Sequence, residues 1–102
     1  MVKMNVEKQM QIAINYYIRQ GYEKEEAIDL EKQSCYAVLD LNDYLFTDII
    51  TAFAVHLDNI GELEEIPKYL YKYINFYKWY EDFVKEGGRI SKIYENVYII
   101  TW

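Results

Sequence analysis

Apolar residues recur at intervals of three and four positions in three stretches of the chain, and this spacing predicts three amphipathic helices. The first covers residues 5–20 and stops before Gly21. The second covers residues 43–58, with Asn42 or Asp43 as its cap and apolar positions at Phe46, Ile49, Ile50, Phe53, Leu57 and Ile60. The third ends at two glycines and presents one apolar face made of Phe76, Trp79, Tyr80, Phe83 and Val84.

The segments between these helices predict shorter elements. Residues 23–33 carry acids in a first turn, as a helix dipole favours, and the apolar run 35–39 has the length of a strand. Pro67 is suited to opening a further helical turn. The tail alternates apolar and polar residues around Glu95-Asn96, which predicts a β-hairpin that pairs with the strand at 36–39.

The order of these elements predicts an α+β fold, with about four helices and a small antiparallel sheet that includes the C-terminal β-hairpin. A chain of 102 residues, 52% of them apolar, forms one domain over residues 1–102 and has enough apolar material for a core. No apolar run reaches the ~20 residues of a membrane span, and residues 1–5 lack the apolar run of a signal peptide. We therefore expect a cytoplasmic protein.

Few residues offer catalytic or metal-binding chemistry. The single cysteine, Cys35, cannot form an internal disulfide, and with the single histidine, His56, it cannot make a Cys/His zinc site. We expect Cys35 to be buried and His56 to be incidental. Residues 40–43 resemble the start of a calcium loop, but Leu45 and Thr51 stand where that loop needs glycine and glutamate. The sequence predicts no enzyme, no metal and no cofactor.

Charge is distributed unevenly along the chain, whose net charge is −6. No lysine or arginine occurs between Lys32 and Lys68, whereas seven carboxylates do: Asp40, Asp43, Asp48, Asp58, Glu62, Glu64 and Glu65. Such a block repels nucleic-acid phosphates and attracts basic surfaces. The alternative is a solvated acidic face that aids solubility.

Aromatic residues are concentrated in residues 68–80, where lysines alternate with tyrosines. This composition suits a platform for single-stranded nucleic acid, through stacking rings and Lys68, Lys72 and Lys78. It equally suits a protein interface, and several of the rings fall on the core face of a helix. The chain has 12 tyrosines and an acidic block beside this segment, so we favour the interface.

Residues 61–76 resemble the antirestriction motif of the ArdA proteins of plasmids, conjugative transposons and phages. The family pattern is G-x-L-x-E-[VI]-P, two residues, L, two residues and Y-I-D-Y, and the chain reads GELEEIPKYLYKYINF. Asn75 replaces the aspartate of this pattern. In the following Y-G-R-D segment, Tyr80 and Glu81 replace the glycine and the arginine. The N-terminal domain of the family has no counterpart in this sequence.

The resemblance implies a protein that mimics DNA and occupies the DNA-binding site of a type I restriction–modification enzyme in a bacterial host. It also implies a homodimer with an interface at the motif, at Gly61, Leu63, Glu65, Ile66, Pro67, Leu70, Tyr73 and Ile74. The seven carboxylates of residues 40–65 then stand in for phosphates. The alternative is a dimeric interaction module, or an inhibitor of another defence system such as CRISPR, that acts through its tyrosines.

Overall fold

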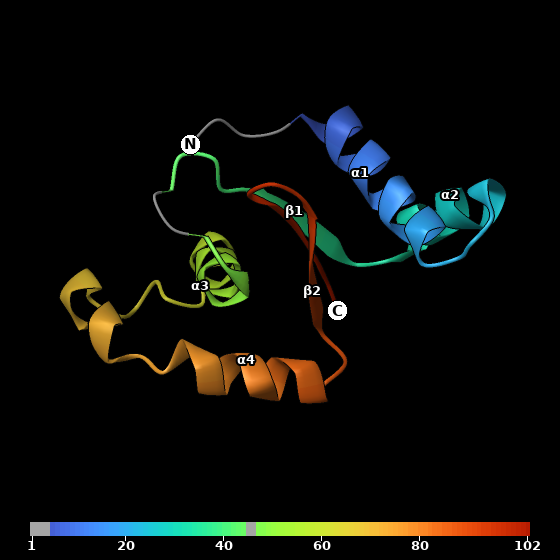
Figure 1. Cartoon of the computed structure of the whole chain (residues 1–102). Coiled ribbons are helices and arrows are strands. Elements are labelled where there is room, and N and C mark those ends of the chain that lie inside the picture. The colour runs from blue at the N-terminus through green and yellow to red at the C-terminus, as the bar shows by residue number, and fades with distance from the viewer. Residues whose placement is uncertain (1–4, 45–46) are drawn as a thin grey trace.

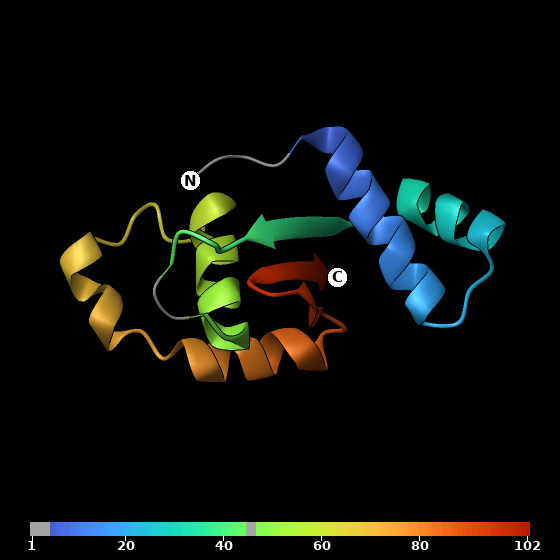
Figure 2. The same cartoon turned by 45° about the horizontal axis from the view of Figure 1, so that its top comes forward.

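A small antiparallel sheet lies between two groups of helices, one on each of its faces (Figures 1 and 2). The computed structural model describes residues 5–44 and 47–102. Its elements, in chain order, are α1 (Val6–Arg19), α2 (Lys24–Gln33), β1 (Tyr36–Asp40), α3 (Ile49–Asn59), the 3-10 helix η1 (Lys68–Tyr73), α4 (Phe76–Lys85), β2 (Arg89–Tyr94) and β3 (Val97–Thr101). This architecture confirms the predicted α+β class with its C-terminal hairpin.

The sheet has the strand order β1-β3-β2, so the last strand of the chain is the central one. The predicted pairing of the hairpin with the earlier strand is confirmed: Tyr36 lies opposite Thr101, and Asp40 lies opposite Val97. The hairpin turns at Glu95 and Asn96. Asn96 has a φ of 61°, in the left-handed region that asparagine tolerates better than most residues.

Strand β3 is buried on both faces because its alternating side chains enter two separate cores. Val97 and Ile99 belong to the cluster that contains Ile12 and Ala13 of α1. Tyr98 and Ile100 belong to the larger cluster, which contains residues of α3 and is covered by the aromatic face of α4. The sheet therefore separates α1 and α2 from α3, η1 and α4 (Figure 1).

Helix α3 begins later than the sequence indicated. Asp48, not Asn42 or Asp43, is its N-cap, and the Asp48 carboxylate accepts a hydrogen bond from the backbone N–H of Thr51 at 2.7 Å. The predicted apolar position Phe46 lies outside the described residues. The capping prediction was wrong because residues 41–44 form a turn, closed by a hydrogen bond from the Tyr44 N–H to the Leu41 carbonyl oxygen at 3.0 Å.

That turn is tied to the hairpin. The side chain of Asp40 accepts hydrogen bonds from the backbone N–H and the side-chain amide of Asn42. The side-chain oxygen Oδ1 of Asn96 accepts a hydrogen bond from the Thr47 hydroxyl at 2.6 Å. The backbone carbonyl oxygen of Asn96 accepts another from the Leu41 N–H at 2.7 Å. These partners are far apart in sequence, so local spacing alone does not reveal them.

A chain of tight turns joins α3 to α4. Gly61, with a φ of 83°, follows the C-cap of α3, a conformation that glycine adopts without strain. Pro67 then precedes η1, and its carbonyl oxygen accepts a hydrogen bond from the Leu70 N–H at 2.9 Å. The predicted helical turn after Pro67 is thus confirmed, as a 3-10 helix.

Candidate interaction surface around helix α3

Six of the seven carboxylates of residues 40–65 lie on α3 or on the connections that flank it, and Asp40 is the last residue of β1. Asp40 is half-buried and the other six are exposed: Asp43, Asp48, Asp58, Glu62, Glu64 and Glu65. Of the acids before Asp40, Glu7 lies on α1, and the others lie on α2 or at its N-cap, at the opposite end of the molecule (Figure 2). The acids between Glu23 and Glu65 therefore form two groups in space.

The carboxylates around α3 are not neutralised by salt bridges. Within residues 5–44 and 47–102, the one ion pair joins Lys78 Nζ to Asp82 Oδ1 at 3.4 Å. Asp40 and Asp48 have structural roles, one in the turn after β1 and the other as the cap of α3. The remaining five leave their charge available to a basic surface: Asp43, Asp58, Glu62, Glu64 and Glu65.

The acids of α2 form the second group, and one of them is used inside the fold. Glu23, Glu25, Glu26 and Asp29 are exposed. Glu31 is buried and accepts a hydrogen bond from the Tyr36 hydroxyl at 2.7 Å. Burial raises the pKa of Tyr36, and its bond to Glu31 raises it further, so this phenol stays protonated and acts as the donor.

The residues of the ArdA-like motif divide between packing and exposure. Leu63 is only 2% exposed and belongs to the core under α3, and Ile66 and Ile74 are half-buried against the same core. These three side chains fix the segment to the domain. Leu70 is also half-buried, whereas the surface presents Gly61, Glu65, Pro67 and Tyr73.

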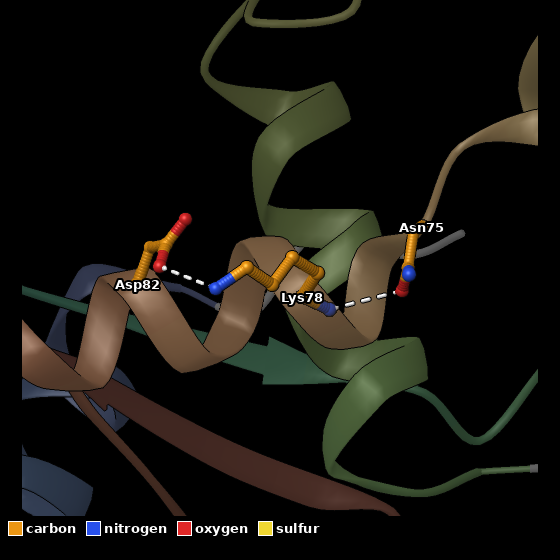
Figure 3. Close-up of polar contacts among 3 residues, drawn as sticks. All are labelled: Asn75, Lys78 and Asp82. Atoms are coloured by element: carbon orange, nitrogen blue, oxygen red, sulfur yellow. Dashed lines mark hydrogen bonds and ion pairs between the residues drawn. The ribbon is translucent and has the colours of Figure 1, made fainter.

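Asn75 begins α4. Its side chain accepts a hydrogen bond from the Lys78 backbone N–H at 3.0 Å, and the Lys78 ammonium pairs with Asp82 one turn later (Figure 3). Asparagine and aspartate are both good N-caps. An aspartate at position 75, as in the ArdA pattern, could make the same cap.

Replacing this cap provides a stability test of the motif. The substitution Asn75→Ala leaves a first-turn N–H without its partner and should lower the free energy of unfolding by about 1 kcal/mol. Asn75→Asp should keep the wild-type value to within a few tenths of a kcal/mol. Urea denaturation followed by circular dichroism measures both. Equal stability of the alanine and aspartate variants would contradict the capping role.

The tyrosines of residues 69–77 also include both exposed and half-buried side chains. Tyr69, Tyr73 and Tyr77 are 72%, 74% and 62% exposed, on η1 and the first turn of α4. Tyr71 is half-buried, and its hydroxyl donates a hydrogen bond to the Leu63 carbonyl oxygen at 3.4 Å. The three exposed tyrosines thus follow the acidic connection 60–67 along the chain, on the two helices that come after it.

The structure does not favour a platform for single-stranded nucleic acid. The rings of Trp79 and Tyr80 pack on the core around Phe53, so they are not free to stack on bases. Lys78 is engaged by Asp82, and the Lys72 ammonium lies 5.3 Å from the centre of the Tyr73 ring. Repulsion from the neighbouring carboxylates acts against phosphates as well.

The two residues with the most reactive side chains lie where the sequence did not predict them. Cys35, expected in the core, is exposed just before β1. His56 is 4% exposed, on the buried side of α3, and its ring centre is 5.2 Å from that of Trp102. Apolar spacing on α3 could have placed His56 inside, because position 56 lies three residues after Phe53 on the same face.

Neither a metal site nor a membrane-spanning helix is found in the part of the chain that the structure describes. No three histidine, cysteine or carboxylate side chains gather there in a way that could hold a metal ion. No described helix is long and apolar enough to cross a bilayer. In comparisons with protein-family models, curated proteins and solved structures, nothing matches this chain.

Proposed function

We propose that this protein is an acidic, non-enzymatic inhibitor that occupies the DNA-binding surface of a bacterial defence enzyme. The observation that carries the proposal is the group of exposed carboxylates around α3 that no lysine or arginine of the described residues pairs with. A surface of this kind attracts the basic groove in which an enzyme holds its DNA.

The target that we propose is a type I restriction–modification enzyme. This choice rests on the likeness of residues 61–76 to the ArdA motif, together with the location of that motif in the structure. The connection 60–67, which holds the most conspicuous part of the motif, also holds three of the exposed carboxylates, Glu62, Glu64 and Glu65. The resemblance and the unpaired charge therefore fall on the same surface.

Charge density favours a homodimer as the inhibitory form. Helix α3 has 11 residues, which corresponds to a length of about 16 Å. Duplex DNA of that length carries about ten charges. One chain offers seven carboxylates around α3, and two of these have structural roles. A dimer would double the number of available carboxylates. The exposed Tyr69 and Tyr73, which follow the acidic connection in the chain, offer the amphipathic rings that protein interfaces favour.

Inhibition of a purified type I restriction enzyme tests this proposal. With unmodified DNA and ATP, cleavage should fall as the protein is added, and the inhibition should weaken about tenfold or more between low and physiological salt, because screening acts on both charged surfaces. A gel shift of the protein with DNA alone serves as the control and should show no complex. Absence of inhibition at low salt, or inhibition that salt does not change, would overturn the proposal.

The alternative function uses the tyrosines instead of the acids. An interaction module of this kind would bind its partner through Tyr69, Tyr73 and Tyr77, the three exposed rings of η1 and α4. Their combined replacement by alanine would then abolish binding, whereas neutralising the carboxylates would leave it intact. Tyr71 is excluded from this test because its ring and hydroxyl hold the connection to α3.

A further inference from the structure

A cavity of about 350 Å³ opens between the C-terminal end of α4, helix α3 and the last residue of the chain. Figures 1 and 2 both show the C-terminus close to that end of α4. The lining residues are His56, Ile60, Phe83, Glu86, Gly88 and Trp102. His56 and Gly88 are buried and form the floor, whereas Ile60, Glu86 and Trp102 are exposed and form the mouth. The volume is that of a small-ligand site.

The floor of the cavity holds a polar side chain without a partner. His56 is 4% exposed as a residue, and no hydrogen bond of its imidazole is found within the described residues. Since no fully buried side-chain nitrogen or oxygen lacks a partner there, its ring nitrogens are reached from the open cavity. Burial lowers the pKa of His56, so at neutral pH the ring is uncharged and keeps one nitrogen as an acceptor. An uncharged imidazole nitrogen that faces an open cavity can accept a hydrogen bond from a ligand that donates one.

The walls and the mouth restrict the ligand further. Trp102 and Phe83 contribute two aromatic rings to the lining, and the faces of such rings attract flat cations. Glu86 places a carboxylate at the mouth, and within the described residues no ion pair engages it. The cavity thus combines two rings, one anionic acceptor and one neutral acceptor.

The geometry points to a binding site for a guanidinium group, on free arginine or on an arginine side chain of a partner protein. A guanidinium is planar, stacks on aromatic rings and carries five N–H donors in a fork. Its charge and donors suit the Glu86 carboxylate and the His56 acceptor nitrogen, and its flat face suits the Trp102 ring, and all three residues line this cavity. A lysine ammonium lacks the flat face, and an anion would be repelled by Glu86.

A second cavity of about 220 Å³ adjoins the first and shares His56, Ile60 and Phe83 with it. Glu62 is also among its lining residues. The pair of cavities offers room for the alkyl stem that joins a guanidinium to its backbone, with a second carboxylate nearby. This site stands on the cavities themselves and does not depend on the proposed inhibition of a defence enzyme.

The experiment is a titration of the full chain with blocked arginine (N-acetyl-arginine amide), followed through the two indole N–H signals in a nitrogen–proton correlation spectrum. The Trp102→Phe variant assigns the signals of Trp79 and Trp102. Saturable movement of the Trp102 signal is expected. Blocked citrulline, which has the same shape without the charge, should bind at least tenfold more weakly. A parallel titration with free arginine distinguishes an arginine side chain of a partner from the free amino acid as the ligand. If free and blocked arginine bind equally, the side chain is sufficient. If free arginine binds more tightly, the ligand is the free amino acid.

Two isosteric variants locate the site. Glu86→Gln should weaken blocked arginine about tenfold, because it removes a charge-assisted pair without changing the shape of the side chain. Glu25→Gln, an equal change on α2, which packs against α1 away from the cavity (Figure 2), should leave binding unchanged. The proposal is overturned if no saturable shift occurs, if citrulline binds as well as arginine, or if the two variants bind equally.

Discussion

Neutralising the carboxylates in the last turn of α3 and in the connection after it should weaken inhibition of the restriction enzyme about 100-fold. The variant combines four isosteric changes: Asp58→Asn, Glu62→Gln, Glu64→Gln and Glu65→Gln. If each exposed charge contributes about 0.7 kcal/mol against a basic surface, four contribute about 2.8 kcal/mol, which corresponds to two powers of ten in affinity. Asp48 is left unchanged, because losing the cap of α3 would destabilise the fold and obscure the effect of charge.

The structure supplies a matched control for this variant on α2. The changes Glu23→Gln, Glu25→Gln, Glu26→Gln and Asp29→Asn remove four exposed charges and also take the net charge from −6 to −2. These positions lie at the opposite end of the molecule (Figure 2). If inhibition depends on the surface around α3, the control keeps most of its activity. Equal losses in both variants would show that only net charge matters and that no particular surface mimics DNA.

Truncating Phe53 should have the largest effect on stability, with a loss of about 3–5 kcal/mol in the free energy of unfolding for Phe53→Ala. The ring is 1% exposed and lies at the centre of the contact between α3 and α4. Its centroid is 6.3, 5.6 and 5.1 Å from those of Trp79, Tyr80 and Phe83. Removing the Phe53 ring leaves a cavity where three aromatic rings meet. The whole free energy of unfolding of a small domain is only about 5–15 kcal/mol, so this loss is a large part of it.

Urea denaturation measures this loss, and Tyr77→Ala is its control. Tyr77 is on the same helix, α4, but is 62% exposed, so its truncation should change stability by about 0.5 kcal/mol or less. A Phe53→Ala variant that was no less stable than Tyr77→Ala would contradict the docking of α4 on α3. It would also remove the basis of the cavity that these helices line together.

Local sequence patterns were sufficient for most elements. The apolar stripe of α4, the helix over residues 24–33 and the hairpin around Glu95 and Asn96 each depend on neighbours within a few positions. Pairing of the hairpin with β1 was also predictable, because each strand needs a partner and few strands exist. The continuous apolar run 97–100 could also have predicted that β3 is buried on both faces. Strands buried in this way lack the alternation of apolar and polar residues that half-exposed strands show.

The start of α3 and the contents of the site were not predictable in this way. Asn42 and Asp48 are both suitable caps, and the choice between them is made by Asn96, which is 54 residues away from Asn42 and holds the preceding turn. Likewise, nothing near His56 in the sequence indicates that Trp102 lies 5.2 Å from its ring. These features depend on contacts between distant segments.

The sequence by itself determined the helices, the hairpin, the α+β class and the amount of negative charge, because these depend on residue type and on spacing within one element. The tertiary structure decided where that charge lies. The sheet is central, so the acids of α2 and those around α3 are held at different ends of the molecule (Figure 2). Burial of β3 on both faces fixes this separation, since each face needs its own layer of helices to exclude water.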